Sequence, residues 1–251
     1  MTQRPLSQTL RQIAVGALAV HLLWYLAALT LRMPALADPV TVYAAIGEVW
    51  RDGMALHLAA SLGRILSGLF IALLLALLLA LAIFRFPRTG KVIDAMVYFA
   101  YPVPKLALLP VVMLLMGLGD APKVTMIVLI ILFQLTVTLR DSLRRIPPEE
   151  FLTLRSLGAS ELQMLRHLLL PSIAPDILSG LRVAVGTAIS VLFVTETYGT
   201  DRGMGYYIVD AWMRVDYTDM YAGILILSLT GFLLFLLSDL AEKALTPWRH
   251  P

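Results

Sequence analysis

Residues 65–84 read ILSGLFIALLLALLLALAIF, a run of twenty residues without a charged side chain. A helix of about 20 apolar residues is long enough to cross the ~30 Å hydrocarbon core of a membrane. The whole chain of 251 residues is 59% hydrophobic and 15% charged, whereas soluble domains are less apolar and more charged. No alternating short strands of a transmembrane barrel are visible. The sequence therefore predicts an all-α, polytopic transmembrane helical bundle.

The apolar runs predict about six spans, near residues 12–31, 61–84, 92–117, 123–139, 174–196 and 221–241. The first run is long and lacks a small-residue cleavage pattern, so we interpret it as a retained span and not as a signal peptide. The third is interrupted by Pro102, Pro104 and Pro110. A proline inside a span frees a carbonyl group that needs a partner within protein or a wet cavity. The weakly apolar third and fifth spans are therefore expected inside the bundle.

The basic residues predict the orientation, because short cytoplasmic loops carry an excess of Lys and Arg. With a cytoplasmic amino terminus, five of them fall on the outer side: Arg32, Arg51, Lys123, Arg202 and Arg214. Twelve fall on the cytoplasmic side: Arg4, Arg11, Arg85, Arg88, Lys91, Arg140, Arg144, Arg145, Arg155, Arg166, Lys243 and Arg249. Both termini and the segment 149–171 are therefore predicted to be cytoplasmic.

Two segments are expected on the outer side. Residues 39–57 are moderately amphipathic and predict an interfacial helix. Residues 197–220 form a polar stretch with four tyrosines, which suit a membrane-interface belt as well as a docking surface: Tyr198, Tyr206, Tyr207 and Tyr217.

The segment 149–171, EEFLTLRSLGASELQMLRHLLLP, predicts two short helices joined by a turn. Pro147 and Pro148 favour the start of the first helix, and Gly158 favours its end. Ser160 and Gln163 form a capping box that begins the second helix, and Pro171 is expected to end it before the fifth span. The apolar stripes of these helices either fill a groove on a soluble partner or pack on the chain's own bundle, and periodicity alone favours packing on the bundle.

The spacing from Gly158 to Pro171 resembles the coupling loop of type I, binding-protein-dependent ABC importer permeases. The family pattern is Glu-Ala-Ala, three residues, Gly, nine residues, Ile, any residue, Leu, Pro. Nine residues also follow Gly158 here, and the sequence then reads Leu168-Leu169-Leu170-Pro171. Leu152, Thr153 and Leu154 occupy the Glu-Ala-Ala positions, so the opening of the motif is absent. Glu149 and Glu150 are nearby candidates to replace its glutamate.

Four other stretches resemble the same family, in the same order along the chain, over roughly residues 55–245. They are Ser61-Leu62-Gly63-Arg64, PVPKLALLPVVMLLMGLG at 102–119, Gly180-Leu181-Arg182, and Gly203-Met204-Gly205-Tyr206 after Glu196. The chain is most similar to the nitrate, sulfonate and taurine permease group, which also includes carriers of thiamine-precursor pyrimidines.

The resemblance implies the type I ABC importer transmembrane-domain fold with a cytoplasmic coupling hairpin. Residues 1–56 would form an N-terminal span and outer interfacial segment, 57–245 the transmembrane core with the hairpin at 147–171, and 246–251 a cytoplasmic tail. The protein would lie in the bacterial cytoplasmic (inner) membrane, surrounded by lipid. Its expected partners are a second copy of itself, a cytoplasmic ABC ATPase dimer, and a periplasmic or lipid-anchored substrate-binding protein. No nucleic acid is expected.

The chain has no Gly-x-x-x-x-Gly-Lys-Ser/Thr phosphate loop, so ATP and Mg are expected on the separate ATPase. The chain itself is expected to be no enzyme and to hold no cofactor. It has no cysteine, and its four histidines show no metal-ligand spacing. The resemblance assigns ATPase coupling to Arg155, Ser156, Leu157, Gly158, Ala159, Ser160, Leu170 and Pro171.

Charged residues within spans are candidates for the translocation pathway, because burying a charge in a membrane is costly. Lys105, beside Pro104, is either a cation near the path of an anionic solute, or a lysine that reaches the cytoplasmic interface or pairs with Glu196 or Asp176. Glu196 either pairs with a basic residue to hold an outer gate or is a plain interfacial carboxylate.

Two arginines in or near spans have other expected roles. Arg64 is expected to cap the outer end of the second span. Arg182 is expected to be an anchor or a subunit-interface residue.

Two other classes of function remain to be compared with an importer permease. An intramembrane enzyme would need a paired acid and base or a metal cluster, and the sequence shows no such set. A secondary transporter or channel that works without ATP often contains internal repeats, and none is evident. A sulfonate-, taurine- or nitrate-like anion is the first expectation for the solute, and a pyrimidine precursor or other aromatic is the second.

Overall fold

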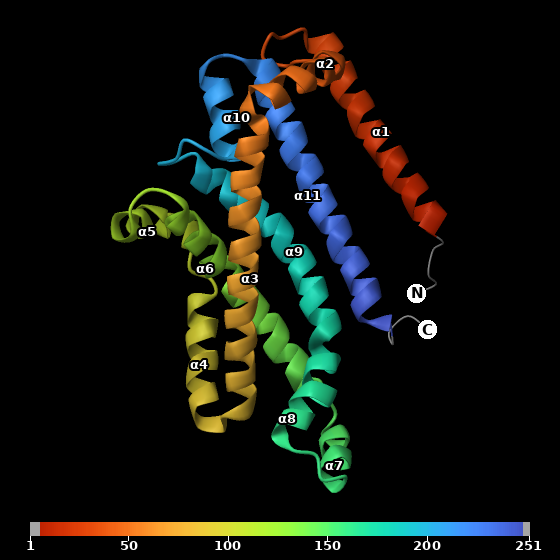
Figure 1. Ribbon diagram of the computed structural model, residues 1–251, viewed down its shortest axis with the longest axis vertical. Helices are drawn as coiled ribbons and strands as arrows, with labels where there is room; N and C mark the ends of the chain where they lie inside the picture. Colours follow the sequence, from red (N-terminus) through yellow and green to blue (C-terminus); the bar gives the residue numbers. More distant parts are fainter. Residues whose placement is uncertain (1–5, 248–251) are drawn as a thin grey trace.

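The computed structural model describes residues 6–247 and the side chains of 11–247, and every regular element in this range is a helix. Four long helices run along the molecule (Figure 1): α3 (Ala55–Arg85), α6 (Asp120–Arg144), α9 (Leu170–Glu196) and α11 (Tyr217–Leu245). Arg4, Arg249 and positions 248–251 of the expected tail lie outside the described residues. The predicted all-α transmembrane bundle is confirmed.

The centre of the bundle is α6, which packs against α3 and against α9. On α3, Ala72, Ala76 and Ala80 are fully buried at intervals of four residues, which places them on one face of the helix. These small residues let α3 approach α6 closely, as in many membrane bundles. At Gly68 a Cβ would lie 2.6 Å from Cγ2 of Ile127, so the Ile127 side chain of α6 fills the space that a side chain at position 68 would occupy. This contact fixes the pair of helices around which the others are arranged.

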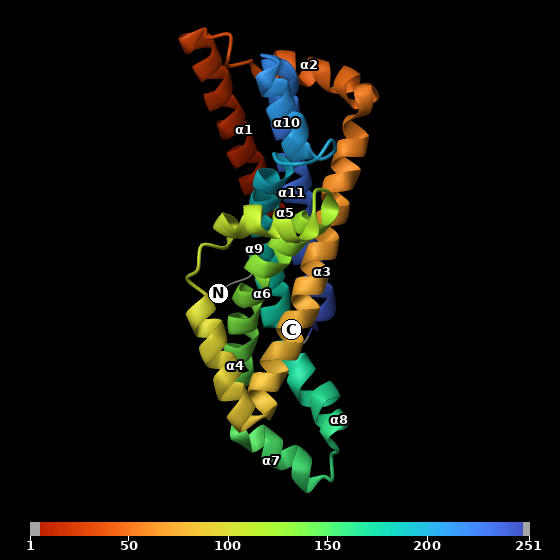
Figure 2. The same ribbon diagram turned by 90° about the vertical axis from the view of Figure 1, so that its left-hand side faces the viewer.

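Among the described residues, five helical segments are long and apolar enough to cross a membrane: Arg11–Leu31, Pro39–Arg85, Asp120–Arg144, Glu161–Glu196 and Tyr217–Leu245. The predicted third span is a broken segment, because α4 (Pro87–Ala100) and the following η2 (Lys105–Leu108) and α5 (Leu109–Met116) are bent by 88°. The break contains Pro102 and Pro104, which have no N–H to continue a helix. Figure 2 shows α5 lying across the bundle.

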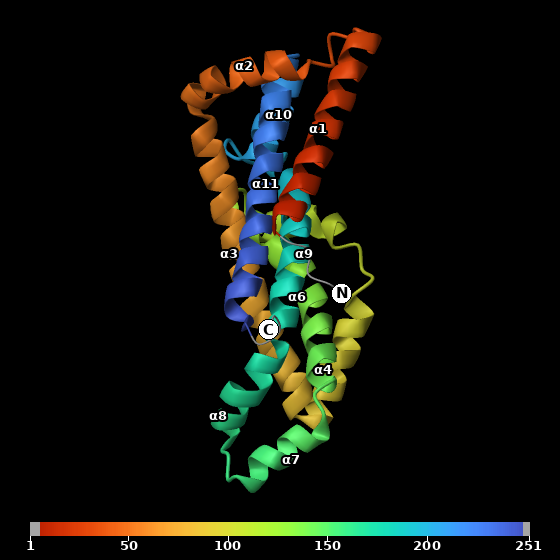
Figure 3. The ribbon, with the colours of Figure 1, turned by 90° about the vertical axis from the view of Figure 1, so that its right-hand side faces the viewer.

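The amino-terminal part lies at the side and over one end of the bundle. The helix α1 (Leu6–Leu31) flanks the bundle, and α2 (Pro39–Val49) crosses its end (Figure 3). A π-helical turn at Trp50–Met54, with Gly53 at φ 104°, joins α2 to α3, which therefore begins at Ala55 and not near 61. The predicted helix is present over Pro39–Val49, and its continuation to 57 is wrong because the chain turns at Gly53. Its position at the membrane interface stays a prediction.

Candidate functional site

The segment 147–171, called the hairpin below, extends beyond the end of the bundle (Figure 1). Its first helix, α7 (Pro148–Ser156), begins at the predicted proline with two glutamates in its first turn. Gly158 has φ +77°, a left-handed conformation that glycine adopts without strain. Ser160 caps α8 (Glu161–Met164): its Oγ accepts from the N–H of Gln163 at 3.3 Å, and the Gln163 Oε1 accepts from the N–H of Ser160 at 2.7 Å. The predicted helix, turn and capping box are confirmed.

The hairpin does not end at Pro171, and that part of the prediction is wrong. The helix continues from α8 through a π-helical turn at Leu165–Leu169 into α9. In this turn the N–H of Leu170 bonds to the carbonyl of Leu165. Pro171 then falls in the first turn of α9, where a missing N–H is tolerated. The second helix of the hairpin is therefore joined directly to a long helix of the bundle.

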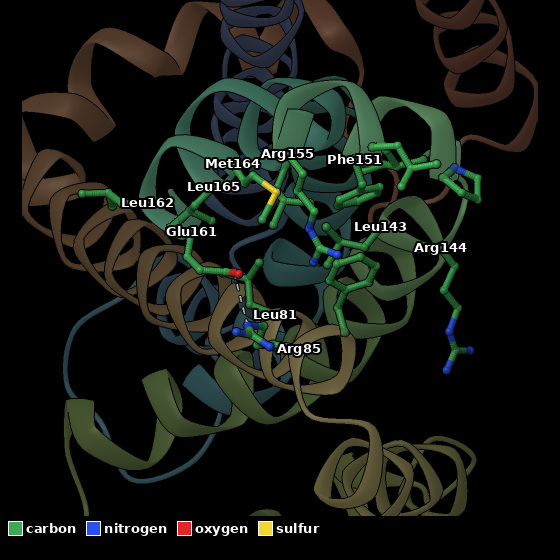
Figure 4. Close-up of a pocket in the computed structure, with 15 residues that line it drawn as sticks. Leu81, Arg85, Leu143, Arg144, Phe151, Arg155, Glu161, Leu162, Met164 and Leu165 are labelled. Atoms are coloured by element: carbon green, nitrogen blue, oxygen red, sulfur yellow. Dashed lines mark ion pairs between the residues drawn. The ribbon is translucent and has the colours of Figure 1, made fainter. Parts of the chain in front are cut away.

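The apolar residues of the hairpin face two ways. Phe151 packs on the bundle, with its ring 5.8 Å from the ring of Phe84 at the end of α3. Leu152, Leu157 and Leu162 are 65%, 78% and 72% exposed. Packing on the bundle therefore accounts for only part of the apolar surface. A pocket of about 820 Å³ lies between the hairpin and the ends of α3 and α6 (Figure 4).

A buried ion pair lies toward the end opposite the hairpin. Arg64 of α3 and Glu196 at the end of α9 have side chains that are 6% and 1% exposed, and the Nη1 of Arg64 donates to the Oε1 of Glu196 at 2.6 Å. Arg64 also donates to Asp120 at the start of α6, at 2.7 Å, and to the carbonyl of Arg202, at 2.8 Å. One guanidinium thus connects α3, α6, α9 and the loop after α9.

The carboxylate of Glu196 receives further hydrogen bonds. The Ser61 hydroxyl lies 2.8 Å from Oε1 and 2.9 Å from Oε2, and the N–H of Gly205 donates to Oε2 at 2.9 Å. The Ser61 Oγ in turn accepts from the N–H of Met204 at 2.8 Å. A buried charge is tolerated when it is paired and its remaining lone pairs are hydrogen-bonded. We call Ser61, Arg64, Asp120, Glu196, Gly203 and Gly205 the Glu196 cluster.

The two glycines of the Gly-x-Gly-Tyr stretch make room for this carboxylate. At Gly203, which has φ +133°, a Cβ would lie 2.5 Å from the Oε1 of Glu196. At Gly205, a Cβ would lie 2.5 Å from the carbonyl oxygen of Phe193. Any side chain at either position would displace Glu196 or the end of α9. The motif is therefore a steric requirement of the buried ion pair.

These positions settle two of the predictions. The pairing of Glu196 with a basic residue is confirmed, and the partner is Arg64. The expectation that Arg64 caps the end of its span is wrong, because α3 begins at Ala55 and Arg64 lies inside the helix. A cleft of about 650 Å³ beside the cluster is lined by Arg64, Asp120, Asp201 and Arg202, among others.

Lys105 lies at the proline break. Its amino group donates to the carbonyl oxygens of Ala100 and Tyr101 at 3.0 and 2.8 Å, and it lies 4.8 Å from the ring centre of Phe133. The end of a helix leaves carbonyls without partners, and the lysine satisfies two of them. The proposed pairing of Lys105 with Glu196 or Asp176 is wrong, since Arg64 binds the former and Arg145 the latter.

The comparisons agree with this architecture. The model of the family "binding-protein-dependent transport system inner membrane component" matches residues 58–250. The chain belongs to this family. It is a type I ABC importer permease, a multi-pass protein of the inner membrane.

Curated relatives carry related names. The permease is 31% identical to the taurine transport system permease protein of Escherichia coli over 97% of this chain and 92% of that protein. It is 30% identical to the formylaminopyrimidine transport permease protein of Halalkalibacterium halodurans over 92% of this chain and 93% of that protein.

Solved structures share the fold at low sequence identity. A bacterial ABC transporter involved in the import of alginate matches with a TM-score of 0.64 at 15% identity, over 94% of this chain and 96% of that chain. The methionine ABC transporter in an inward-facing conformation matches with a TM-score of 0.63 at 18% identity, over 74% of this chain and 93% of that chain.

Three further ion-pair groups near the hairpin end of the permease were not predicted. Asp94 of α4 pairs with Arg140 and Arg144 of α6, and Asp176 of α9 pairs with Arg145. An acid near a span is a signal that a basic partner is close, but spacing along the chain does not say which one.

The third group joins α9 to α11. Arg182 pairs with Asp239 and with Glu242, the latter at 2.9 Å. The role of Arg182 as an anchor of its span stays a prediction, and so does a subunit-interface role.

One helix of the permease was also missed. The stretch 197–220 contains α10 (Met204–Met213), whose residues Met204, Ile208 and Ala211 are buried. Their helical spacing was the available signal. The hydroxyl of Tyr207 donates to Asp219 at 3.0 Å, and burial together with this carboxylate raises the pKa of Tyr207. Within residues 6–247 no cluster of His, Asp and Glu could hold a metal ion.

Replacing Gly203 with alanine tests the steric role of the Gly-x-Gly stretch. We expect Gly203→Ala to lower the free energy of unfolding of the permease by about 1–3 kcal/mol through backbone strain, with a further loss from the contact with Glu196. The measurement is the thermal unfolding midpoint in detergent. Gly63→Ala on α3 is the matched control, because a Cβ there meets nothing within 4 Å. Equal midpoints for the two variants would contradict the assignment.

Proposed function

We propose that this permease is the membrane subunit of an ATP-driven importer. Two copies of the chain form the pathway for a small solute, two ATPase subunits bind the hairpins, and a substrate-binding protein delivers the solute at the opposite end. The structure of the hairpin supports this proposal most strongly. It extends beyond the bundle, exposes three leucines, and continues as one helix into α9.

The hairpin is suited to transmit a movement of the ATPase. Amphipathic helices bind apolar grooves of partner proteins through exposed large side chains. Leu157 and Gly158 lie at the tip, where nothing else in the described chain covers them. Because α8 and α9 form a continuous helix, a displacement of the tip is passed on to α9. We assign ATPase coupling to Arg155, Ser156, Leu157, Gly158, Ala159, Ser160, Leu170 and Pro171.

The proposed orientation places the hairpin, the amino terminus and the carboxyl terminus in the cytoplasm. The basic residues Arg85, Arg88 and Lys91 at the junction of α3 and α4 then face the same side as the hairpin, in keeping with the excess of Lys and Arg in cytoplasmic loops. The division into 1–56, 57–245 and 246–251 is part of the same proposal.

A second copy of the chain is proposed to cover the α4–α5 face. Tyr98 and Phe99 of α4 are 79% and 81% exposed, and Leu114 and Leu115 of α5 are 86% and 80% exposed. Exposed apolar patches are found where proteins meet each other or lipid. Lipid contacts the remaining apolar surface, including α1.

The solute is proposed to be a small sulfonate-like anion, with a pyrimidine precursor as the second candidate, because relatives named for each class are about equally similar. Pro104, Lys105 and Glu196 are proposed to border its path. Lys105 would contribute a positive charge at the break between α4 and α5, and the Glu196 cluster would keep the helices at the outer end of the path together.

The proposed binding of the ATPase to the hairpin tip, called the dock below, is tested by Gly158→Asp. We expect this variant to reach the membrane but to lose the co-purifying ATPase and at least about 90% of solute-stimulated ATP hydrolysis. A side chain at φ +77° strains the turn, and a new carboxylate disfavours an apolar contact. The control is Gly47→Asp on α2, an exposed glycine at the other end with nothing within 4 Å of its Cβ. An ATPase that binds both variants equally would refute the dock, and wild-type uptake without any ATPase would favour a secondary transporter.

The pathway role of Lys105 is tested by Lys105→Met. We expect the apparent KM for a sulfonate solute to rise about tenfold, because the variant removes a positive charge beside the path, while Lys105→Arg keeps most of the affinity. The measurement is uptake into vesicles with the complete transporter. An unchanged KM and maximal rate in Lys105→Met would leave the lysine with only its contacts to the carbonyls of α4.

A further inference from the structure

The pocket behind the hairpin has an apolar floor. It is lined by Leu81 and Phe84 of α3, Leu143 of α6, Met164 of α8, and Leu165 of the π-helical turn. Its volume of about 820 Å³ lies within the range of pockets that hold drug-sized molecules, roughly 300–1,000 Å³. The helices α3 and α6 are long and apolar enough to cross a membrane, and the pocket lies at their ends.

The rim of the same pocket is basic. Arg85, Arg144, Arg155 and Glu161 line it, so the rim carries three positive charges and one negative charge. Arg85 pairs with Glu161 at 3.4 Å, with both side chains more than half exposed, and Arg144 pairs with Asp94 outside the pocket at 2.8 Å. An exposed ion pair of this kind is weak and is readily exchanged for a stronger partner.

Arg155 is the unpaired charge of the rim. In the part of the chain that the structure describes, no carboxylate lies within ion-pair distance of it. Figure 4 shows its guanidinium directed over the pocket, between Leu143 and Arg85. An arginine in this position offers two parallel N–H donors, a geometry that matches a phosphate or a carboxylate.

We propose that the pocket binds an anionic phospholipid of the adjacent leaflet. The phosphate lies between Arg85 and Arg155, and an acyl chain covers the floor at Leu81 and Phe84. Basic pockets among transmembrane helices on the cytoplasmic side bind anionic headgroups in this way. The assignment to the cytoplasmic leaflet depends on the proposed orientation, whereas the binding chemistry does not.

The ATPase is the other candidate to fill this space, and the geometry favours lipid. Arg155, Leu152 and Leu162 of the hairpin line the pocket, whereas Leu157 and Gly158 at the tip do not. An ATPase that contacts the hairpin at its tip therefore leaves the floor at Leu81 and Phe84 uncovered. A bound lipid would join the end of α3 to both hairpin helices and would stiffen the hairpin against the bundle.

The full chain in detergent is mixed with equal amounts of phosphatidylglycerol and phosphatidylcholine that have matched acyl chains. Native mass spectrometry then measures which lipid the chain retains. We expect the wild-type chain to retain phosphatidylglycerol preferentially. The double variant Arg85→Gln/Arg155→Gln removes both charges and should weaken the retention of phosphatidylglycerol about fivefold for each arginine removed. Arg88→Gln is the matched control, an exposed arginine at the same end that does not line the pocket. Equal retention of the two lipids by wild type, or undiminished retention by the double variant, would overturn the proposal.

A second measurement keeps both arginines. Phe151 is replaced with the photocrosslinker benzoylphenylalanine in the complete transporter, reconstituted in vesicles of the same two lipids. A phosphatidylglycerol adduct supports the lipid site, whereas an adduct with the ATPase would overturn it. Lipid retention by the chain alone does not involve the ATPase, so failure of this proposal is distinct from failure of the proposed importer function.

Discussion

The buried ion pair between Arg64 and Glu196 is the interaction on which the end of the bundle opposite the hairpin depends. A carboxylate that is 1% exposed is stable only if its charge and its lone pairs have partners, and Arg64, Ser61 and the N–H of Gly205 supply them. These partners come from α3 and from the start of α10. The requirement explains in turn why Gly203 and Gly205 carry no side chain.

One helix links this cluster to the hairpin. Glu196 is the last residue of α9, and the same helix continues in the other direction through Leu165–Leu169 into α8. The helix from α8 to Glu196 contains the π-helical turn at Leu165–Leu169 and Pro175. In the proposed importer this connection couples the ATPase to the outer end of the pathway, and the lipid pocket lies where the connection begins.

Local features of the sequence predicted the spans and the hairpin well, because they depend on residues close together in the chain. Gly158, Ser160 and Gln163 each act within a few residues of their partners. Continuation of the helix through Pro171 was missed because a π-helical turn shifts the register ahead of the proline. The identity of Arg64 as the partner of Glu196 was also missed, since two helices must first fold together before residues so far apart meet. For the same reason no pattern showed that Gly203 borders a buried carboxylate, or that the break at Pro102 and Pro104 bends the chain by 88°.

A double-mutant cycle on Arg64 and Glu196 tests the central interaction most directly. The free energy of unfolding is measured in detergent for Arg64→Gln, Glu196→Gln, the double variant and wild type. Each single variant leaves a buried charge with fewer partners and should lose about 3–5 kcal/mol. The double variant should lose clearly less than the sum, with a coupling free energy above about 1 kcal/mol. Losses that add to within about 0.5 kcal/mol would show that the two side chains act independently and would contradict this account.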